Sequence, residues 1–260
     1  MSGQRERAEH FTALHVKGDP LIIYNVWDAG SAKAVAAAGA KAIATGDHPV
    51  GFAHGYDLDD FGEFTFDMYL VTIREIAARI GDLPFSVDIS NGGGLDGTGL
   101  RERLRVLLDL GVVGVNFEDR LDDSSGVRPA AEQAERIAAL IEEATVAGVP
   151  LHVNARTDLF STAGDTPPAE LLDEAVERAE AYQRAGARSL FTPRLLDLHV
   201  IRSLAERIDL PLNIIRLPGA PSTRELASAG VARVSYGPVA QTRTMAWVTE
   251  QAKAALASEV

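Results

Sequence analysis

The sequence contains no cysteine among its 260 residues. Without cysteine, the chain can form no disulfide framework, no thiolate metal site and no cysteine nucleophile. It also has no run that approaches the roughly 18 apolar residues of a membrane-spanning helix, and its polar N-terminal segment, residues 1–19, has no apolar signal core. We therefore expect a soluble, cytoplasmic protein with no membrane partner.

Basic residues are outnumbered by acidic ones. The chain has 25 Lys and Arg against 37 Asp and Glu, which gives a formal net charge of -12. This charge repels nucleic acid, so no nucleic-acid partner is expected. A small anionic ligand would need local cations or a metal ion to bind. The apolar fraction of 46% is ordinary for a globular enzyme and is enough for a large core.

A strand-then-helix pattern begins at Leu21 and repeats along the chain. The predicted strands are Leu21–Tyr24, Ala42–Thr45, Phe85–Val87, Gly114–Phe117, Leu151–Asn154, Ser189–Thr192, Leu212–Ile215 and Arg233–Tyr236. The predicted helices are Ser31–Ala38, Phe66–Arg79, Leu100–Leu110, Pro129–Ala147, Pro168–Ala185, Val200–Arg207, Thr223–Ala229 and Val239–Ala257.

This pattern predicts the fold. Glycine or proline follows most of the helices and leads quickly into the next strand, which fits a (β/α)8 barrel better than a doubly wound sheet. We predict a single-domain (β/α)8 TIM barrel spanning 1–260, with 1–18 as a helical or irregular N-terminal extension. Residues 46–65 are expected to form a long irregular loop on the face where barrel enzymes keep their substrate loops.

Carboxylates follow two of the predicted strands. Asp88 comes directly after an apolar run, and Glu118 and Asp119 end the next one. A helical run between them makes the strands parallel, so both strand ends lie at one edge of the sheet. Convergent carboxylates there favour either a hard-cation site or an acid/base pair. Arginines also follow later strands, among them Arg156 and Arg194, and would supply counter-charges for a carboxylate or phosphate ligand.

Several ordered motifs resemble one enzyme family. They are NVWDAGSA at 25–32, ATGD at 44–47, HGYD at 54–57, SVDISNGGG at 86–94, VNFED at 115–119 and VNARTD at 153–158, followed by AGARSLFTP, LPLNII, GAPS and GVARVSYG. Together they resemble the isocitrate lyase and phosphoenolpyruvate mutase superfamily over nearly the whole chain. The resemblance implies a Mg2+-dependent enzyme, with Mn2+ as an alternative ion, that acts on small 2-keto or 2-hydroxy carboxylates through an enolate.

The resemblance also implies roles for particular residues. The implied metal-site positions are Asp88, Glu118 and Ser90. The implied catalytic residues are Arg156, Asp57 and Glu118, where Arg156 steadies the developing enolate charge. The implied substrate-binding residues are Thr45, Gly46, Asp47, Asn154, Arg156 and Asn213.

Three departures from the family pattern bear on function. Ser90 stands where the family has a second acidic residue, which removes one negative charge from the metal site. Asp47 stands where a small residue is common, and it would favour an amine- or hydroxyl-bearing ligand. The loop over 121–128 has neither the lysine-cysteine-glycine-histidine motif of the isocitrate and methylisocitrate lyases nor the lysine and asparagine pattern of the mutases.

These observations lead to three functional hypotheses. The first is a Mg2+-dependent carbon-carbon lyase of the retro-aldol or retro-Claisen type. The second is chemistry like that of phosphoenolpyruvate mutase, phosphonopyruvate hydrolase or oxaloacetate decarboxylase. The third is a barrel that binds a carboxylate without turnover. The resemblance also implies a homo-oligomer, a dimer or tetramer, built by exchange of the C-terminal helix Val239–Ala257.

Four polar residues have structural interpretations as well. Asp28 is predicted to cap a helix, and His152 is predicted to lie in the core or an interface. Asp119 and Arg120 are predicted to form a surface ion pair. Asn154 is expected either to tie strands together or to contact a ligand.

Overall fold

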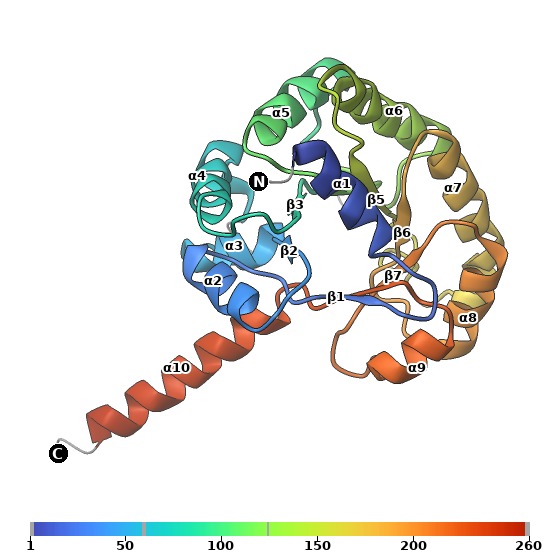
Figure 1. Ribbon diagram of the computed structural model, residues 1–260. Coiled ribbons are helices and arrows are strands. Elements are labelled where there is room, and N and C mark those ends of the chain that lie inside the picture. The colour runs from blue at the N-terminus through green and yellow to red at the C-terminus, as the bar shows by residue number, and fades with distance from the viewer. Residues whose placement is uncertain (1–2, 59–60, 124, 258–260) are drawn as a thin grey trace.

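The computed structural model describes residues 3–58, 61–123 and 125–257 as a barrel of eight parallel strands (Figure 1). The strands are β1 (Leu21–Ile23), β2 (Ile43–Ala44), β3 (Phe85–Asp88), β4 (Gly114–Glu118), β5 (His152–Arg156), β6 (Ser189–Phe191), β7 (Leu212–Ile215) and β8 (Arg233–Ser235). Neighbours in sequence pair with one another, and β8 pairs with β1. A parallel bridge between Val26 and Thr45 joins the β1 and β2 sides and closes the ring. The predicted (β/α)8 barrel is confirmed.

Helices alternate with the strands along the chain, and most of them pack around the ring (Figure 1). They are α1 (Gln4–Ala13), α2 (Ala29–Ala37), α3 (Asp47–Ala53), η1 (Phe61–Glu63), α4 (Phe66–Ala77), α5 (Gly97–Asp109), α6 (Ala130–Val146), η2 (Pro168–Leu171), α7 (Leu172–Arg184), α8 (Leu198–Arg207), α9 (Thr223–Ser228) and α10 (Val239–Ala257). Within the described part of the chain, none of them is long and apolar enough to cross a membrane.

Helix α5 shows how the sequence pattern produces this arrangement. Its leucines at 100, 104, 107 and 108 recur every three or four residues and are all buried. Asp96 precedes the helix, and its side chain accepts a hydrogen bond from the Gly99 N–H, which satisfies one of the free amides of the first turn. Asp28 does the same for α2 by accepting from the Ser31 N–H at 2.6 Å, so the predicted cap is confirmed.

Helix α1 covers the N-terminal end of the barrel (Figure 1). The Gln4 side-chain amide donates to the carbonyls of Leu108 and Val112, both at 2.9 Å, which ties the helix to the return before β4. Phe11 is fully buried against Gly114, where an added Cβ would lie 2.7 Å from the phenylalanine ring. The absence of a side chain at this glycine therefore lets α1 plug the barrel end that lies opposite the strand C-termini.

The expected irregular loop over 46–65 is wrong in part, because α3 and η1 lie within it. Gly46 has an extended backbone and precedes α3, and Asp47 and Pro49 occupy its first turn, where a negative charge and a fixed φ both favour a helix. The helix is only seven residues long and contains Gly51, so its periodicity is too short to be recognised in the sequence.

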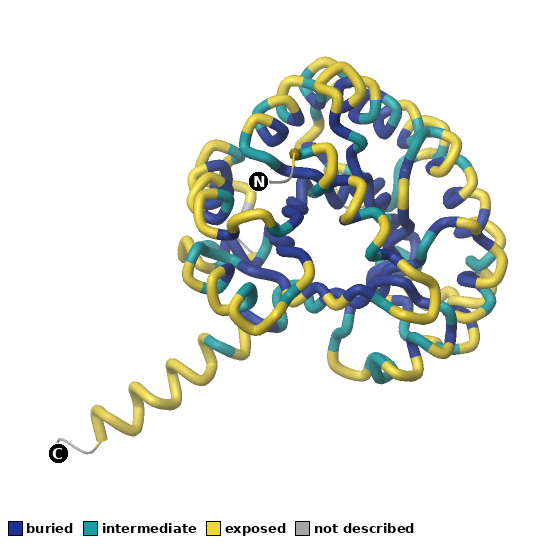
Figure 2. The backbone as a smooth tube through the Cα atoms, in the orientation of Figure 1, coloured by how far each residue is buried: buried dark blue, intermediate teal, exposed yellow. Residues whose placement is uncertain are grey.

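Helix α10 projects away from the barrel instead of packing on it (Figure 1). Ala240 and Gln241, in its first turn, are its buried residues. The rest of the helix is largely exposed, in contrast to the buried strands (Figure 2). The outward face of β1 is consequently uncovered, with Ile22 42% and Tyr24 43% exposed.

Candidate active site

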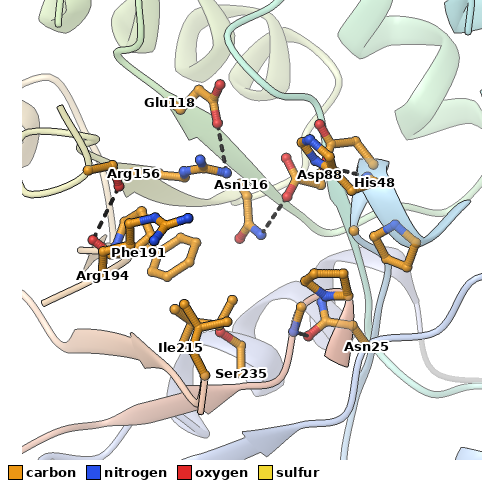
Figure 3. A pocket seen from close by; sticks show the side chains of 18 of the residues that line it. Asn25, His48, Asp88, Asn116, Glu118, Arg156, Phe191, Arg194, Ile215 and Ser235 are labelled. Atoms are coloured by element: carbon orange, nitrogen blue, oxygen red, sulfur yellow. Dashed lines mark hydrogen bonds and ion pairs between the residues drawn. The ribbon is translucent and has the colours of Figure 1, made fainter. Parts of the chain in front are cut away.

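A cavity of about 970 Å³ opens at the C-terminal ends of the strands (Figure 3). This is the face on which barrel enzymes carry their active sites. The predicted site residues in its wall are Gly46, Asp47, Asp88, Glu118 and Arg156. Its wall also includes Asn25, His48, Asn116, Arg120, Phe191, Arg194, Ile215 and Ser235.

Asp88 ends β3 and is buried at the cavity wall. Its Oδ1 accepts a hydrogen bond from the Ser90 N–H at 3.0 Å, and its Oδ2 accepts one from the Asn116 amide at 3.4 Å. Burial and the nearby negative charge of Asp47 raise the pKa of Asp88 to about 6. A group that binds near Asp88 and carries positive charge would therefore be favoured.

Glu118 and Arg156 end the adjacent strands β4 and β5 and form an ion pair. Arg156 Nη1 lies 2.8 Å from Glu118 Oε2. Burial raises the pKa of Glu118, and this effect outweighs the opposing charge of Arg156. Burial also disfavours the charged form of Arg156, but Glu118, Asp158 and Asp88 together raise its pKa, so it remains a cation.

Asp158 fixes the orientation of Arg156. Its two carboxylate oxygens accept from Nε and Nη2 of Arg156 at 3.0 and 2.9 Å. This bidentate pair leaves Nη1 directed at Glu118 and holds the planar guanidinium in the cavity wall.

The predicted surface ion pair between Asp119 and Arg120 is wrong. Asp119 is fully buried; its Oδ1 accepts from the Asp158 N–H, and its Oδ2 accepts from Arg178 and Tyr182. The alternation of side chains along β4 turns Asp119 away from the cavity that Glu118 faces. Asp119 therefore anchors the segment that carries Asp158.

Asp47, His48 and Ser90 form a second polar group at the cavity edge. Ser90 Oγ donates to Asp47 Oδ2 at 2.6 Å, and Asp47 Oδ1 lies 2.9 Å from Nδ1 of His48. Burial would raise the pKa of Asp47, but the hydrogen bonds from His48 and Ser90 lower it overall. Burial would lower the pKa of His48, but the hydrogen bond and the negative charge of Asp47 raise it overall. The charge of Asp88 also raises this pKa, whereas the charge of Arg156 lowers it.

Asn154 and Asn213 lie inside the barrel and are fully buried rather than in the cavity wall. The Asn154 amide donates to the side-chain oxygens of Asn116 and Asn213 at 2.9 and 3.0 Å, and its oxygen accepts from Ser189 at 2.6 Å. Asn213 in turn donates to Ser235 at 3.1 Å. The network ties β4, β5, β6, β7 and β8 together beneath the cavity, so substrate contact by either asparagine stays a prediction.

Thr45 is also buried below the wall, while Gly46 lies in it. Thr45 Oγ1 shares a 2.6 Å hydrogen bond with the Tyr69 hydroxyl and accepts from the Asp88 N–H at 3.3 Å. Thr45 therefore holds the backbone at the end of β3. Asp57 is exposed on the loop after α3, next to Leu58, which lines the cavity. Its catalytic role stays a prediction.

Several wall residues were not predicted as site residues. Asn116 precedes Glu118 by two positions on β4, so strand alternation alone places both on the inner face. Phe191 and Ser235 end β6 and β8 in the same way. His48 directly follows Asp47 in the sequence, and the contact between the two side chains is what gives His48 a role at the site.

The oxygen-rich wall fits a hard cation. Asp88 and Glu118 supply carboxylate oxygens and Asn116 an amide, and Mg2+ commonly uses one or two carboxylates while keeping several waters. Among the described residues, no three His, Asp or Glu side chains are grouped closely enough to form a ready-made metal cage. The donor set therefore suits an ion that is shared with water and substrate.

Comparisons with known proteins cover nearly the whole chain. The family model of phosphoenolpyruvate phosphomutase matches residues 11–256. The 2-methylisocitrate lyase of Escherichia coli (strain K12) is 31% identical over 246 residues, 90% of this chain and 79% of the relative. The 2-methylisocitrate lyase of Bacillus subtilis (strain 168) is 32% identical over 268 residues, 96% of this chain and 81% of the relative. The solved structure of a candidate phosphonomutase from Burkholderia cenocepacia J2315 is 38% identical, with a TM-score of 0.91, and the match covers 97% of this chain and 100% of that one.

Proposed function

Because the chain belongs to the phosphoenolpyruvate phosphomutase family, within the isocitrate lyase and phosphoenolpyruvate mutase superfamily, we propose that it is a Mg2+-dependent carbon-carbon lyase. Its substrate would be a small 2-hydroxy or 2-keto carboxylate. The observation that carries this proposal is the convergence of Asp88, Glu118 and Arg156 in one cavity at the strand C-termini. The names of the two lyases reported above support the same reaction class.

Arg156 would bind the substrate carboxylate and stabilise the charge that develops on an enolate. A fixed, buried guanidinium acts on such charge more strongly than a solvated one, because it needs no reorganisation during the reaction. The bidentate contact with Asp158 provides this fixation. Nη1 of Arg156 pairs with Glu118, so substrate binding would exchange one anionic partner of Arg156 for another.

Asp88 and Glu118 would hold Mg2+, which when bound supplies Lewis-acid stabilisation of negative charge on substrate oxygens. The placement of Ser90 in the metal site stays a prediction, because its hydroxyl donates to Asp47. Gly46 and Asp47 would lie at the substrate, since both line the cavity.

A second candidate reaction is supported by the cations of the wall. Arg120 and Arg194 line the cavity together with Arg156, so a ligand with a second anionic group, a carboxylate or a phosphonate, would find counter-charge there. Phosphorus-carbon cleavage or decarboxylation would use the same enolate stabilisation. The name of the Burkholderia protein supports the phosphonate alternative.

The experiment that tests the proposed function is turnover of a panel of 2-hydroxy, 2-keto and phosphono carboxylates with Mg2+. Carbon-carbon cleavage releases two carbon fragments, phosphorus-carbon cleavage changes the phosphorus NMR spectrum, and decarboxylation releases carbon dioxide. Ligand-induced thermal stabilisation without turnover of any panel member would instead support the non-catalytic barrel.

We also propose a homo-oligomer in which α10 of one copy covers β1 of another. A groove of about 770 Å³ lies between β1 and α2 and is lined by Ile22, Tyr24 and Val35. The strands of parallel α/β proteins are normally covered on both faces, so this groove lacks a helix. Helix α10 has matching apolar side chains, since Trp247 is 60% exposed. The choice between dimer and tetramer and the cytoplasmic location stay predictions.

A further inference from the structure

His48 lies at the cavity wall and contacts the carboxylate of Asp47. It is the second residue of α3, and its backbone N–H and its ring Nδ1 lie 2.7 and 2.9 Å from Oδ1 of Asp47. Two contacts to one oxygen fix the side chain relative to its own backbone. The ring also packs edge-on against Phe52, with centroids 6.0 Å apart. Since Nδ1 faces Asp47, proton exchange with a ligand would use Nε2.

Asp47 is itself held by a residue of the turn that follows β3. Ser90 Oγ donates to its Oδ2 at 2.6 Å, so both carboxylate oxygens are occupied by hydrogen bonds. Ser90 has a positive φ of 50°, a conformation that L-residues seldom adopt and that is concentrated at functional sites. Its N–H donates to Asp88. Ser90 therefore links the end of β3, where the carboxylate of Asp88 lies, to the start of α3.

The other proton-carrying groups in the cavity wall have different tasks. Glu118 is paired with Arg156, and Asp88 accepts hydrogen bonds on both oxygens. Both are also the carboxylates that would hold the metal ion. Of the Asp, Glu and His side chains in the described cavity wall, His48 is then the one whose chemistry is best suited to carry a proton between two substrate atoms.

We propose that His48 is a catalytic acid–base residue and that Asp47 and Ser90 position it. This inference rests on the proposed lyase function and adds a proton carrier to it. In the cleavage, Nε2 of neutral His48 accepts the proton of the substrate hydroxyl, and the hydroxyl oxygen becomes a carbonyl oxygen. The carbon-carbon bond breaks, and its electron pair forms the enolate. The imidazolium then donates a proton to the enolate carbon, so His48 is neutral again at the end of the cycle.

In this arrangement Ser90, which stands where the family has a second acidic residue, has a function of its own. Ser90 cannot add charge to the metal site, but its hydroxyl can fix a carboxylate supplied by Asp47. That carboxylate orients an imidazole, as in the aspartate–histidine pairs of other enzymes. The two residues that depart from the family pattern, Asp47 and Ser90, are therefore in direct contact with each other.

The test is the exchange of the methyl protons of pyruvate for deuterium, followed by proton NMR in D2O with Mg2+. This reaction needs only enolate formation and a proton carrier, so it does not depend on the unknown substrate. His48→Gln should lower the exchange rate by about 100-fold or more, since Gln has no titratable proton. It should leave the affinity for oxalate with Mg2+ nearly unchanged. His199→Gln, an exposed histidine on α8, is the matched control and should exchange at the wild-type rate.

Asp47→Asn and Ser90→Ala test the positioning roles. Both should lower the exchange rate without a matching loss of oxalate affinity, and both should shift the His48 ring resonances in nitrogen–proton NMR spectra. A purely structural role for either residue would leave those resonances in place.

The outcomes separate this inference from the proposed function. If the wild type binds oxalate with Mg2+ but His48→Gln exchanges pyruvate protons as fast as the wild type, His48 is not the proton carrier, although the lyase proposal survives. Wild-type binding without any exchange would also overturn the role of His48. Absence of both binding and exchange in the wild type would overturn the proposed function as well.

Discussion

Arg156 and Glu118 are register partners on adjacent strands, and Nη1 of the arginine lies 2.8 Å from Oε2 of the glutamate. The parallel register places the backbones of both residues side by side, so the two side chains lie within reach of each other at the cavity wall. The bidentate contact with Asp158 on the other side of the guanidinium fixes the positive charge of Arg156 in the cavity wall. The chemistry proposed for this cavity depends on that charge.

In the Arg156→Lys variant, turnover should fall by about 100-fold or more. Lys keeps the positive charge, but its single ammonium group cannot form the bidentate contact with Asp158 and bind a substrate carboxylate at the same time. The lysine would still neutralise the carboxylates of Glu118 and Asp158, so the thermal stability of the protein should change little. Arg184→Lys on α7, an exposed arginine, is the control and should behave like the wild type. Unreduced turnover in Arg156→Lys would remove the arginine from the mechanism.

The Asp88→Asn variant should bind Mg2+ at least about 10-fold more weakly, because it removes a negative oxygen ligand and keeps the side-chain shape. Titration calorimetry with Mg2+ alone measures this directly. Asp209→Asn, at an exposed position, has the same charge change and should not alter the affinity. Equal Mg2+ affinity in all three proteins would mean that the ion binds elsewhere.

The Ile22→Glu and Trp247→Glu variants should each convert the oligomer into a monomer. Each places a charge in the contact proposed between the β1 groove and α10, where it would have to be buried without a partner. Sedimentation velocity measures the outcome. Val146→Glu is the control, because Val146 is 85% exposed at the end of α6, away from both surfaces. A monomeric wild type would contradict the exchange of α10.

The stability of the protein should fall below about pH 6.5 partly because of His15. Burial lowers the pKa of His15 from 6.5 to about 3, so the folded state binds this proton later than the unfolded state does. Its contribution to stability is complete above pH 6.5 and is lost as the pH falls toward 3. Between pH 6.5 and pH 5 the loss is about 2 kcal/mol for this one group.

Urea unfolding at pH 7 and pH 5 measures that loss. His15→Leu should show a smaller decrease in unfolding free energy between the two pH values, because Leu has no proton to bind. His199→Gln should show the wild-type decrease. His152 stacks on His15 with ring centroids 4.1 Å apart, and burial also lowers its pKa, so part of the acid sensitivity should remain in His15→Leu.

The sequence was sufficient for the barrel, because its evidence is periodic and repeated. The leucines of α5 and the glycine or proline at each return gave the element order, and the same logic placed Asp88 and Glu118 at one edge. His152 is fully buried, as predicted. Asn154 ties strands together, which is one of its two predicted roles.

The remaining features depend on contacts between segments that are distant in sequence. The contact of Ser90 with Asp47 spans 43 positions, and nothing local to either residue indicates it. Asp119 was misread because a charged residue next to an arginine resembles a surface pair, whereas its partners Arg178 and Tyr182 come from α7. The sequence of α10 likewise does not indicate that the helix projects away from the barrel (Figure 1).

The most direct test of the account is titration of oxalate, a mimic of the pyruvate enolate, into the protein with Mg2+ and again with a chelator. If Asp88, Glu118 and Arg156 form an enolate-stabilising site, oxalate binds with Mg2+ and not without it, and Arg156→Ala abolishes the binding. Absence of oxalate binding in the presence of Mg2+ would contradict the account.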